Sequence, residues 1–279
     1  MAIEVDARAA GFEAKKLARI GEHLSERYVE PGKIAGCQVL VSRHGIPAYF
    51  ESYGLMDRER NKPMQDDTLF RIYSMSKPIT SVALMMLWEE GRFQLSDPVH
   101  RYIPSWRNQV VWQEGEGSSM VTRRPKAPPT MQHILSHTAG LTYGGLLPGL
   151  ESPVDAAYQH MGVARGDGET LMEFADKLGR VPLLYEPGSK WCYSLATDVC
   201  GALVEIISGQ PFEQFLQERL FSPLGMRDTG FRVSDDQLDR FAACYVRGPD
   251  KQLLLEDDPE TSHYRHKRNF FSGGGGLVG

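Results

Sequence analysis

The amino-acid sequence predicts an α+β protein in which a mostly helical middle segment is enclosed by mixed α/β ends. Three observations support this prediction. A helical pattern followed by two strand patterns opens the chain, a succession of helical patterns occupies residues 131–221, and two further strand patterns lie within 241–257. The early strands are joined by a tight turn and not by a helical crossover, so we expect an antiparallel sheet flanked by helices.

Two elements are expected near the N-terminus. Residues 12–30 (FEAKKLARIGEHLSERYVE) place apolar side chains near helical spacing, and Pro31 then ends the helix. The segments CQVLVSR (37–43) and AYFESYG (48–54) have the composition of strands and flank the turn sequence HGIP. An antiparallel hairpin is therefore expected.

The middle of the chain is expected to be helical. Residues 78–91 (PITSVALMMLWEEG) are apolar on almost every side, which predicts a helix buried in the core. Residues 113–130 (QEGEGSSMVTRRPKAPPT) are expected to form a polar loop. Further helices are expected from 131 to Gly140, at 154–161, at 168–178 and within 195–221, and strands at 241–248 and 251–257.

We expect one domain over residues 1–279, with two lobes. Residues 1–95 and 236–279 would form the α/β lobe, and residues 96–235 the helical lobe. Two or three strands make a poor sheet for a domain of this size, and the final SGGGGLVG (272–279) has the composition of a segment that begins an element. The domain is therefore expected to be incomplete at its C-terminus.

The composition excludes several classes of function. The chain is 41% hydrophobic and 24% charged with a net charge of −5, and its charges are interspersed, so no nucleic-acid partner is expected. No apolar run approaches a membrane span, and the acidic N-terminus lacks the pattern of a signal peptide. The four cysteines show neither metal-site spacing nor the density of a disulfide scaffold. A cytoplasmic protein with no membrane partner is expected.

Ser74 and Lys77 are the candidate nucleophile and base. They form a Ser-x-x-Lys tetrapeptide, and a separation of three places both on the same face of a helical turn. Pro78 fits only near a helix start, and the apolar helix that follows would desolvate the lysine and lower its pKa. About one such tetrapeptide is expected by chance in this chain, and a serine cap with a solvated lysine is an equally simple interpretation.

The surrounding segments add a resemblance to a known family. FRIYSMSKPIT (70–80), with LSDPV (95–99), resembles the first motif of class C β-lactamases, penicillin-binding DD-peptidases and family VIII carboxylesterases. TMQHILSHTAGLTYG (130–144), EPGSKWCYSLATDVCGALVEIISGQPF (186–212) and FSPLGMRDTGF (221–231) are similar to later landmarks of the same family, in the same order. The resemblance implies a β-lactamase/DD-peptidase-like fold and a single catalytic domain.

The same resemblance implies three site residues. It makes Ser74 the nucleophile, Lys77 its partner and Tyr193 the phenol that passes the proton to the leaving group. In such a set the serine attacks a carbonyl, Lys77 and Tyr193 take its proton, and the backbone N–H of Ser74 helps to stabilise the oxyanion. Without the surrounding motif, Tyr193 would be interpreted as a core aromatic residue.

One departure from the lactamase pattern bears on the substrate. The lactamase motif is Tyr-x-Asn, whereas the corresponding sequence here is Tyr193-Ser194-Leu195. A leucine offers an apolar wall where asparagine would bind an amide, which favours small-molecule esters with hydrophobic groups. The Tyr-Ser-Leu form and the LTYG sequence are closest to the esterase branch of the family. Carboxylester hydrolysis is therefore the expected activity.

Other interpretations remain open. They are a β-lactamase or DD-peptidase acting on β-lactam or peptide amides, an acyltransferase that uses the same residues, and an inactive fragment or binding scaffold. The third family motif is expected beyond residue 279. Lys177-Leu178-Gly179 and His160-Met161-Gly162 carry its letters but lie at helix ends, so both are rejected.

No cofactor or metal is expected. His133 and His137 have the spacing of two zinc ligands on a helix, but they lack the adjacent glutamate and a third ligand nearby. Structural roles are therefore expected for both. The short basic cluster at 263–268 is expected to be a solvated loop.

Overall fold

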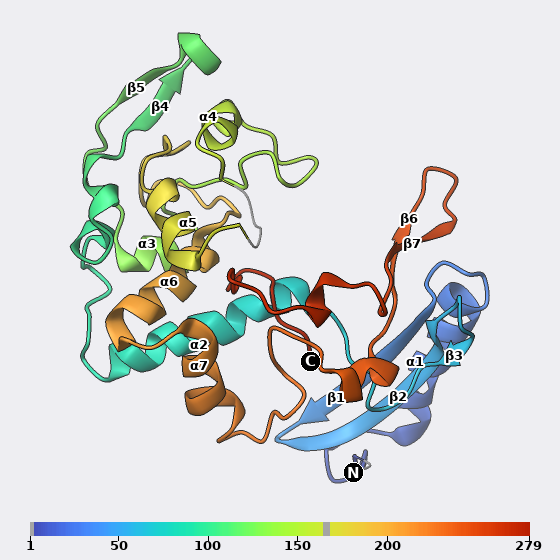
Figure 1. Ribbon diagram of the computed structural model, residues 1–279. Coiled ribbons are helices and arrows are strands. Elements are labelled where there is room, and N and C mark those ends of the chain that lie inside the picture. Colours follow the sequence, from blue (N-terminus) through green and yellow to red (C-terminus); the bar gives the residue numbers. More distant parts are fainter. Residues whose placement is uncertain (1–2, 164–167) are drawn as a thin grey trace. The chain divides into compact units, whose positions relative to one another are not determined.

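The computed structural model describes residues 3–163 and 168–279, which fold as two compact units (Figure 1). The first unit is Met1–Arg71 with Arg232–His266, and the second is Ile72–Phe231 with Lys267–Gly279. The first boundary therefore lies at Arg71 and not near residue 95. The reason is that helix α2 (Ser76–Glu89) packs against α6 (Ala196–Ser208), and so belongs with the helical middle of the chain.

The first unit combines one helix with antiparallel strands. Its elements are α1 (Ala14–Leu24), a π-helical turn (Ser25–Val29), β1 (Gly36–Arg43), β2 (Ile46–Asp57), β3 (Lys62–Pro63), β6 (Cys244–Arg247) and β7 (Leu253–Asp257). β1, β2 and β3 form one sheet, and β6 and β7 form a separate two-stranded sheet. The predicted N-terminal helix and both predicted strand pairs are therefore confirmed.

The turn of the first hairpin explains its register. His44 and Gly45 have φ values of 54° and 75°, so both lie in the left-handed region. Two such residues in succession give the turn whose twist matches that of paired strands. The pairing runs from Arg43 opposite Ile46 to Gly36 opposite Gly54.

Helix α1 lies very close to β2. A Cβ atom at Gly21 would stand 2.1 Å from the hydroxyl of Tyr53, so a larger residue at this point of the helix would have to displace the Tyr53 side chain. The Tyr53 hydroxyl is 2.5 Å from that of Tyr49, and Tyr49 forms a small core with Leu17 and Ala48. The apolar face predicted from the sequence of α1 is thus the face that packs on the hairpin.

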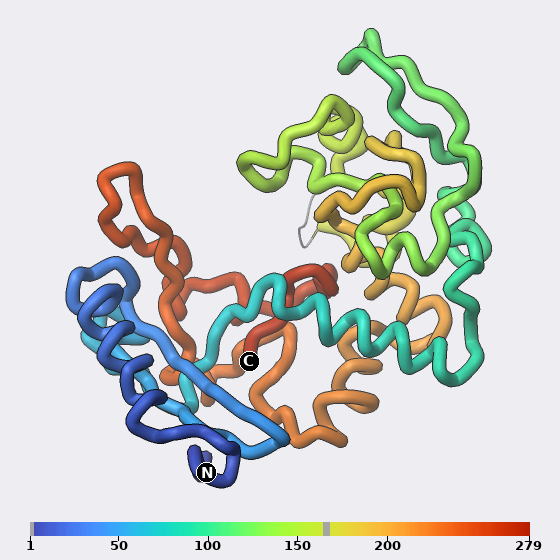
Figure 2. The backbone as a smooth tube through the Cα atoms, turned by 180° about the vertical axis from the view of Figure 1, so that it is seen from behind, coloured from blue at the N-terminus to red at the C-terminus, as the bar shows by residue number. Residues whose placement is uncertain are grey.

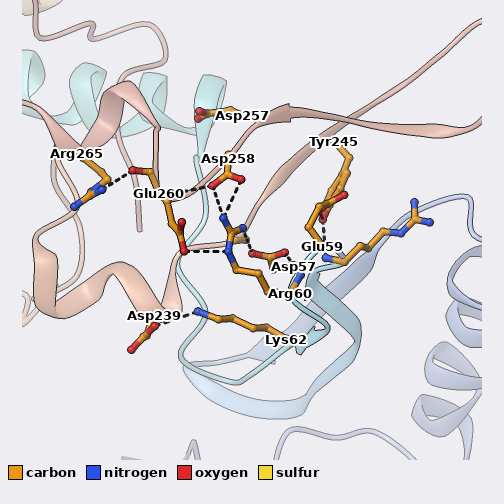
Figure 3. A network of polar contacts seen from close by, with 12 residues as sticks. Asp57, Glu59, Arg60, Lys62, Asp239, Tyr245, Asp257, Asp258, Glu260 and Arg265 are labelled. Carbon is orange, nitrogen blue, oxygen red and sulfur yellow. Dashed lines mark hydrogen bonds and ion pairs between the residues drawn. The ribbon is translucent and has the colours of Figure 1, made fainter.

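Charged side chains join the start of the chain to the segment that follows β7. Figure 3 shows Arg60 between three carboxylates, at 2.7 Å from Asp57, 2.9 Å from Asp258 and 3.1 Å from Glu260. Arg71, whose side chain is 2% exposed, pairs with Asp257 at 2.5 Å. The pairs with Asp257, Asp258 and Glu260 hold together two segments of the first unit that lie about 190 residues apart in sequence.

The second unit is mostly helical. Its elements are α2 (Ser76–Glu89), β4 (Val111–Glu114), β5 (Val121–Arg123), α3 (Met131–Leu135), α4 (Asp155–His160), α5 (Leu171–Leu178), α6 (Ala196–Ser208) and α7 (Phe212–Leu216), which continues as a π-helical turn (Gln217–Phe221). Its large core surrounds α6, where most side chains are buried. All the helices predicted between residues 78 and 221 are present.

Two expectations for this unit need correction. Residues 113–130 are not only a loop, because β4 and β5 pair there as a short antiparallel ribbon, with Trp112 opposite Thr122. α2 is not buried on every side: Ala83 and Leu84 face the core, whereas Val82 and Trp88 are 49% and 37% exposed. An apolar sequence thus predicted the helix correctly but not which of its faces is covered.

The C-terminal segment of the chain returns to α2, as the tube in Figure 2 shows. Ile72 N–H donates to Leu277 O at 3.0 Å, and Val278 exchanges two backbone hydrogen bonds with Gly230. Residues 272–276 form a turn beside the first turns of α2. Across residues 3–163 and 168–279, none of the helices is both long enough and apolar enough to span a bilayer.

Candidate active site

Ser74 lies exposed at the centre of a short 3-10 turn, Tyr73–Met75, that leads directly into α2. The preceding residue, Tyr73, has a φ of 41°, in the left-handed region that residues with a side chain seldom adopt. Met75 N–H donates to Ile72 O at 2.8 Å and closes the turn. The Ser74 hydroxyl is therefore presented at the surface, beside the positive end of a helix.

The structure brings together the three residues that the sequence analysis singled out. The Oγ atom of Ser74 is 2.7 Å from the hydroxyl of Tyr193, and Lys77 Nζ donates to the same Oγ at 3.1 Å. Lys77 stands in the first turn of α2, whereas Tyr193 precedes α6. All three belong to the second unit. Both contacts are within the reach required of a nucleophile and its base.

Lys77 has two further partners that the sequence analysis did not assign. Its Nζ donates to Gly274 O at 2.6 Å and to the hydroxyl of Tyr143 at 3.3 Å. A lysine ammonium carries three N–H donors, and Ser74, Gly274 and Tyr143 supply one acceptor each. The sequence could have indicated Tyr143, because it is the tyrosine of LTYG, a segment that resembles the same family.

The environment of Tyr193 favours its ionised form. Burial alone would raise the pKa of the phenol, but interactions with Lys77, Ser74 and Tyr143 outweigh burial and lower that pKa below its ordinary value. Lys77 Nζ also lies 4.7 Å from the centroid of the Tyr193 ring. A phenol with a lowered pKa is more often ionised near neutral pH, and the phenolate can then act as a general base.

Exposed apolar side chains surround the nucleophile. Trp191 is 63% exposed and stacks on Tyr193, with ring centroids 6.2 Å apart and planes 23° from parallel. Tyr73 and Met75, the neighbours of Ser74 in sequence, are 48% and 67% exposed. A reacting group attached to Ser74 therefore finds aromatic and apolar surface within the same part of the unit.

Leu195 does not form the apolar wall that the sequence analysis assigned to it. Its side chain is fully buried in the core of the second unit. The reason is local: Ser194 and Leu195 lie at the entry of α6, where the backbone turns these side chains inward while Tyr193 stays partly exposed. Trp191 supplies the apolar surface instead.

The ring of His137 packs against the ring of Tyr193. Its ring lies 5.2 Å from that of Tyr193, and its Nδ1 and Nε2 atoms contact Ser194 Oγ at 3.1 Å and Thr197 Oγ1 at 3.4 Å. Burial, together with the positive charge of Lys77, lowers the pKa of His137 to about 4. The imidazole is therefore neutral at neutral pH and is held by hydroxyl groups.

The structure places the remaining candidate residues outside this site. His133 Nδ1 accepts from the backbone N–H of Thr130, as part of a capping box at the start of α3. Lys177 stands in the last turn of α5, where it pairs with Glu169 at 2.6 Å. Within residues 3–163 and 168–279, no group of three or more His, Cys, Asp or Glu side chains could hold a metal ion.

The arrangement has the parts of a covalent acyl-transfer site. A hydroxyl at a helix start contacts both an amine and a phenol with a lowered pKa, and apolar surface lies beside it. Such a hydroxyl can attack a carbonyl carbon while its proton passes to one of the two bases.

Comparison with known proteins agrees with this chemistry. The chain is 35% identical to "Esterase EstB" of Burkholderia gladioli over 265 residues, covering 93% of this chain and 62% of the esterase. The chain therefore spans about three fifths of the length of this relative.

Two solved structures resemble the fold closely. "EstCE1, a hydrolase with promiscuous acyltransferase activity" superposes with a TM-score of 0.79 at 33% identity, over 95% of this chain and 70% of that one. "Simvastatin Synthase (LovD)" of Aspergillus terreus superposes with a TM-score of 0.75 at 27% identity, over 95% of this chain and 65% of that one.

The sequence model of the family described as "Beta-lactamase" matches residues 22–279, which is most of the chain. With the 35% identity to an esterase and the matching α+β architecture, this shows the relationship expected from the motifs. The chain belongs to the beta-lactamase family of serine enzymes.

Proposed function

We propose that this protein hydrolyses carboxylic esters through an acyl-enzyme formed on Ser74. The observation that carries the proposal is the pair of contacts at the nucleophile, with Tyr193 OH at 2.7 Å and Lys77 Nζ at 3.1 Å from Ser74 Oγ. The similarity to EstB and EstCE1, both named for esterase or hydrolase activity, supports it.

The proposed reaction has two steps. In acylation, Ser74 Oγ forms a bond to the carbonyl carbon and its proton passes to the Lys77–Tyr193 pair; the bond from that carbon to the alkoxide oxygen then breaks, and the alkoxide takes a proton from Tyr193, which Lys77 can replace. In deacylation, a water oxygen bonds to the acyl carbon and gives a proton to the same pair; the bond from the carbon to Ser74 Oγ then breaks, Oγ takes that proton, and the carboxylic acid leaves. The backbone N–H of Ser74 would donate to the oxyanion in both steps.

We propose small-molecule esters with a hydrophobic group as the substrates. The exposed ring of Trp191 and the apolar surface of Met75 support this choice, because either can cover an aryl or alkyl group near Ser74. β-Lactams are the competing substrates. Their amide side chain is bound by asparagine in the Tyr-x-Asn motif, and this chain has the buried Leu195 there.

Two measurements test the proposal. Treatment with a fluorophosphonate followed by peptide mass spectrometry should show one adduct, on Ser74, and none in Ser74→Ala. Hydrolysis of p-nitrophenyl butyrate should exceed that of a chromogenic cephalosporin. An unmodified Ser74 in the folded protein would indicate a binding scaffold, and rapid cephalosporin turnover without ester hydrolysis would indicate a lactamase.

Acyl transfer to an alcohol is a second candidate function. The aromatic surface of Trp191 beside the nucleophile favours it, because an apolar alcohol bound there could replace water in the second step. The similarity to EstCE1 and LovD supports the same idea. An added alcohol should divert p-nitrophenyl butyrate into a new ester, detected by chromatography. Unchanged butyrate yield would reject transfer.

We also propose a cytoplasmic location. The support is that Cys37, Cys192 and Cys200, within the described residues, form no disulfide. Fractionation of the producing cells with an antibody to the protein tests this, and recovery outside the cytoplasm would contradict it.

A further inference from the structure

The glycine-rich turn at residues 272–276 is packed tightly between α2 and α6. The Thr80 hydroxyl on α2 donates to Gly273 O at 2.8 Å. On the other side, a Cβ atom at Gly273 would stand 2.7 Å from Thr197 O on α6, so no other residue fits there. The position of this turn is thus fixed by both helices.

Asp198 anchors the turn to α6. This aspartate is completely buried, in the first turn of the helix. Its Oδ1 atom accepts the hydroxyl proton of Ser272 at 2.6 Å and the backbone N–H of Gly274 at 2.9 Å. A buried carboxylate is costly unless hydrogen-bond donors surround it, so its presence at this point needs an explanation.

The same glycine contacts the candidate base. Gly274 O accepts from Lys77 Nζ at 2.6 Å, which is shorter than the contacts from that Nζ to Ser74 and Tyr143. Gly274 is therefore held through its N–H by Asp198 and holds Lys77 through its C=O. One residue links a buried acid to the amine beside the nucleophile.

We propose that Asp198 is a positioning residue, whose carboxylate holds Gly274 so that the Gly274 carbonyl orients the amino group of Lys77 toward Ser74. The proposal deepens the function proposed above and rests on it, because it concerns how Lys77 serves as a base. Neither the sequence motifs nor the resemblance assigned any role to Asp198.

The hydrogen-bond directions give this orientation a chemical meaning. A carbonyl oxygen can only accept, so the bond to Gly274 always uses one N–H of Lys77. A neutral lysine amine has two N–H donors and one lone pair in all. When one N–H bonds Gly274 O, the other N–H and the lone pair are directed to the side where the Ser74 and Tyr143 hydroxyls lie. Fixing the carbonyl therefore prepares the amine to take the proton of Ser74.

Asp198 also contributes charge. The titratable groups around Lys77 are Tyr143, Tyr193, His137 and Asp198 itself, and Asp198 is the acid among them. Its negative charge opposes ionisation of the Tyr193 phenol. Removing that charge should let the phenol lose its proton at lower pH. The acidic limb of a reaction that needs Tyr193 as a base should then move to lower pH.

The test compares three variants of the full chain. Asp198→Asn keeps the shape and removes the charge, Asp198→Ala removes both hydrogen bonds, and Ser272→Ala removes only the bond that does not involve Gly274. The measurement is the rate constant for phosphonylation of Ser74 by a fluorophosphonate between pH 5 and 9. Thermal unfolding of each variant checks that it is folded.

We expect Asp198→Ala to slow phosphonylation by about 10- to 100-fold, the loss typical of a displaced catalytic group. Asp198→Asn should move the acidic limb to lower pH, and Ser272→Ala should stay within about threefold of the parent, because the Gly274 link persists. If Asp198→Ala does not fold, the pH dependence of Ser74 phosphonylation in Asp198→Asn tests the proposal instead. Parental rates and an unshifted limb in the aspartate variants would overturn the proposal.

The two proposals fail differently. If Ser74 of the parent is not phosphonylated at all, the proposed function fails. The positioning role is then decided by crystal structures of the parent and of Asp198→Asn or Asp198→Ala. We expect Lys77 Nζ to leave Gly274 O in the alanine variant, or its contact to lengthen in the asparagine variant. An unchanged Lys77 would overturn the positioning role.

Discussion

Replacement of Tyr193 by phenylalanine is the sharpest test of the site. The substitution removes one oxygen atom, which lies 2.7 Å from Ser74 Oγ, and leaves the ring. The stacking of Trp191 and the contact with His137 are therefore retained. The variant should fold normally, so any loss of activity reports on the hydroxyl alone.

The expected loss of activity in Tyr193→Phe depends on the catalytic groups that the variant keeps. General acid–base catalysis typically contributes 10²–10⁴-fold. Lys77 stays 3.1 Å from Ser74 Oγ and can still accept the serine proton, but the phenol that returns a proton to the leaving alkoxide in the proposed reaction is gone. We therefore expect kcat/KM for p-nitrophenyl butyrate to fall by about 10²–10³, equivalent to about 3–4 kcal/mol of transition-state stabilisation.

The assay includes a matched control and a second leaving group. Tyr245→Phe removes a phenol hydroxyl that contacts Arg58 and Glu59 in the first unit, and it should leave kcat/KM unchanged. An ester of ethanol, a poorer leaving group than p-nitrophenol, should lose more activity in Tyr193→Phe. Less than a threefold loss on both esters would refute the assignment of Tyr193 as proton donor.

Three further outcomes are expected. Tyr143→Phe removes one of the three acceptors of Lys77 and should slow phosphonylation of Ser74 about 3- to 10-fold, with no loss of thermal stability. Arg71→Met leaves the partly exposed Asp257 without its cation, although the Ser262 hydroxyl still donates to it, and should lower the free energy of unfolding in urea by about 1–3 kcal/mol; a loss below about 0.5 kcal/mol would contradict this. His137 has a folded-state pKa of about 4, below its ordinary value, so the unfolded chain takes up its proton first and stability falls as the pH drops from about 6.5 to 4. His137→Gln should lose that part of the pH dependence, at most about 3 kcal/mol, in denaturation curves at pH 7 and pH 4.5.

The sequence predicted most of the elements because their signals are local. The apolar spacing of α1, the hairpin turn at His44 and Gly45, and the glycine after α5 each act within a few residues. The β4–β5 ribbon was missed because its strands are short and the segment between them carries two glycines, Gly115 and Gly117. The exposed face of α2 was missed because burial depends on segments far away in sequence.

The site could be predicted only in part for the same reason. Ser74 and Lys77 are neighbours in sequence, so their spacing alone suggested a pair. Tyr193 lies 119 residues from Ser74, and only a family resemblance linked the two. The roles of Gly274 and Asp198 depend on a turn packed between two helices, which no spacing rule describes.

Tyr73 carries a consequence for anyone who seeks a more heat-resistant variant. A residue with a side chain at a φ of 41° costs about 1–2 kcal/mol relative to glycine, so Tyr73→Gly or Tyr73→Asn would emerge from a screen for thermal stability. Glycine would also give more backbone freedom to the turn that presents Ser74. Selection for heat resistance alone would therefore favour a less firmly held nucleophile, and a useful screen must score thermal stability and turnover in the same round.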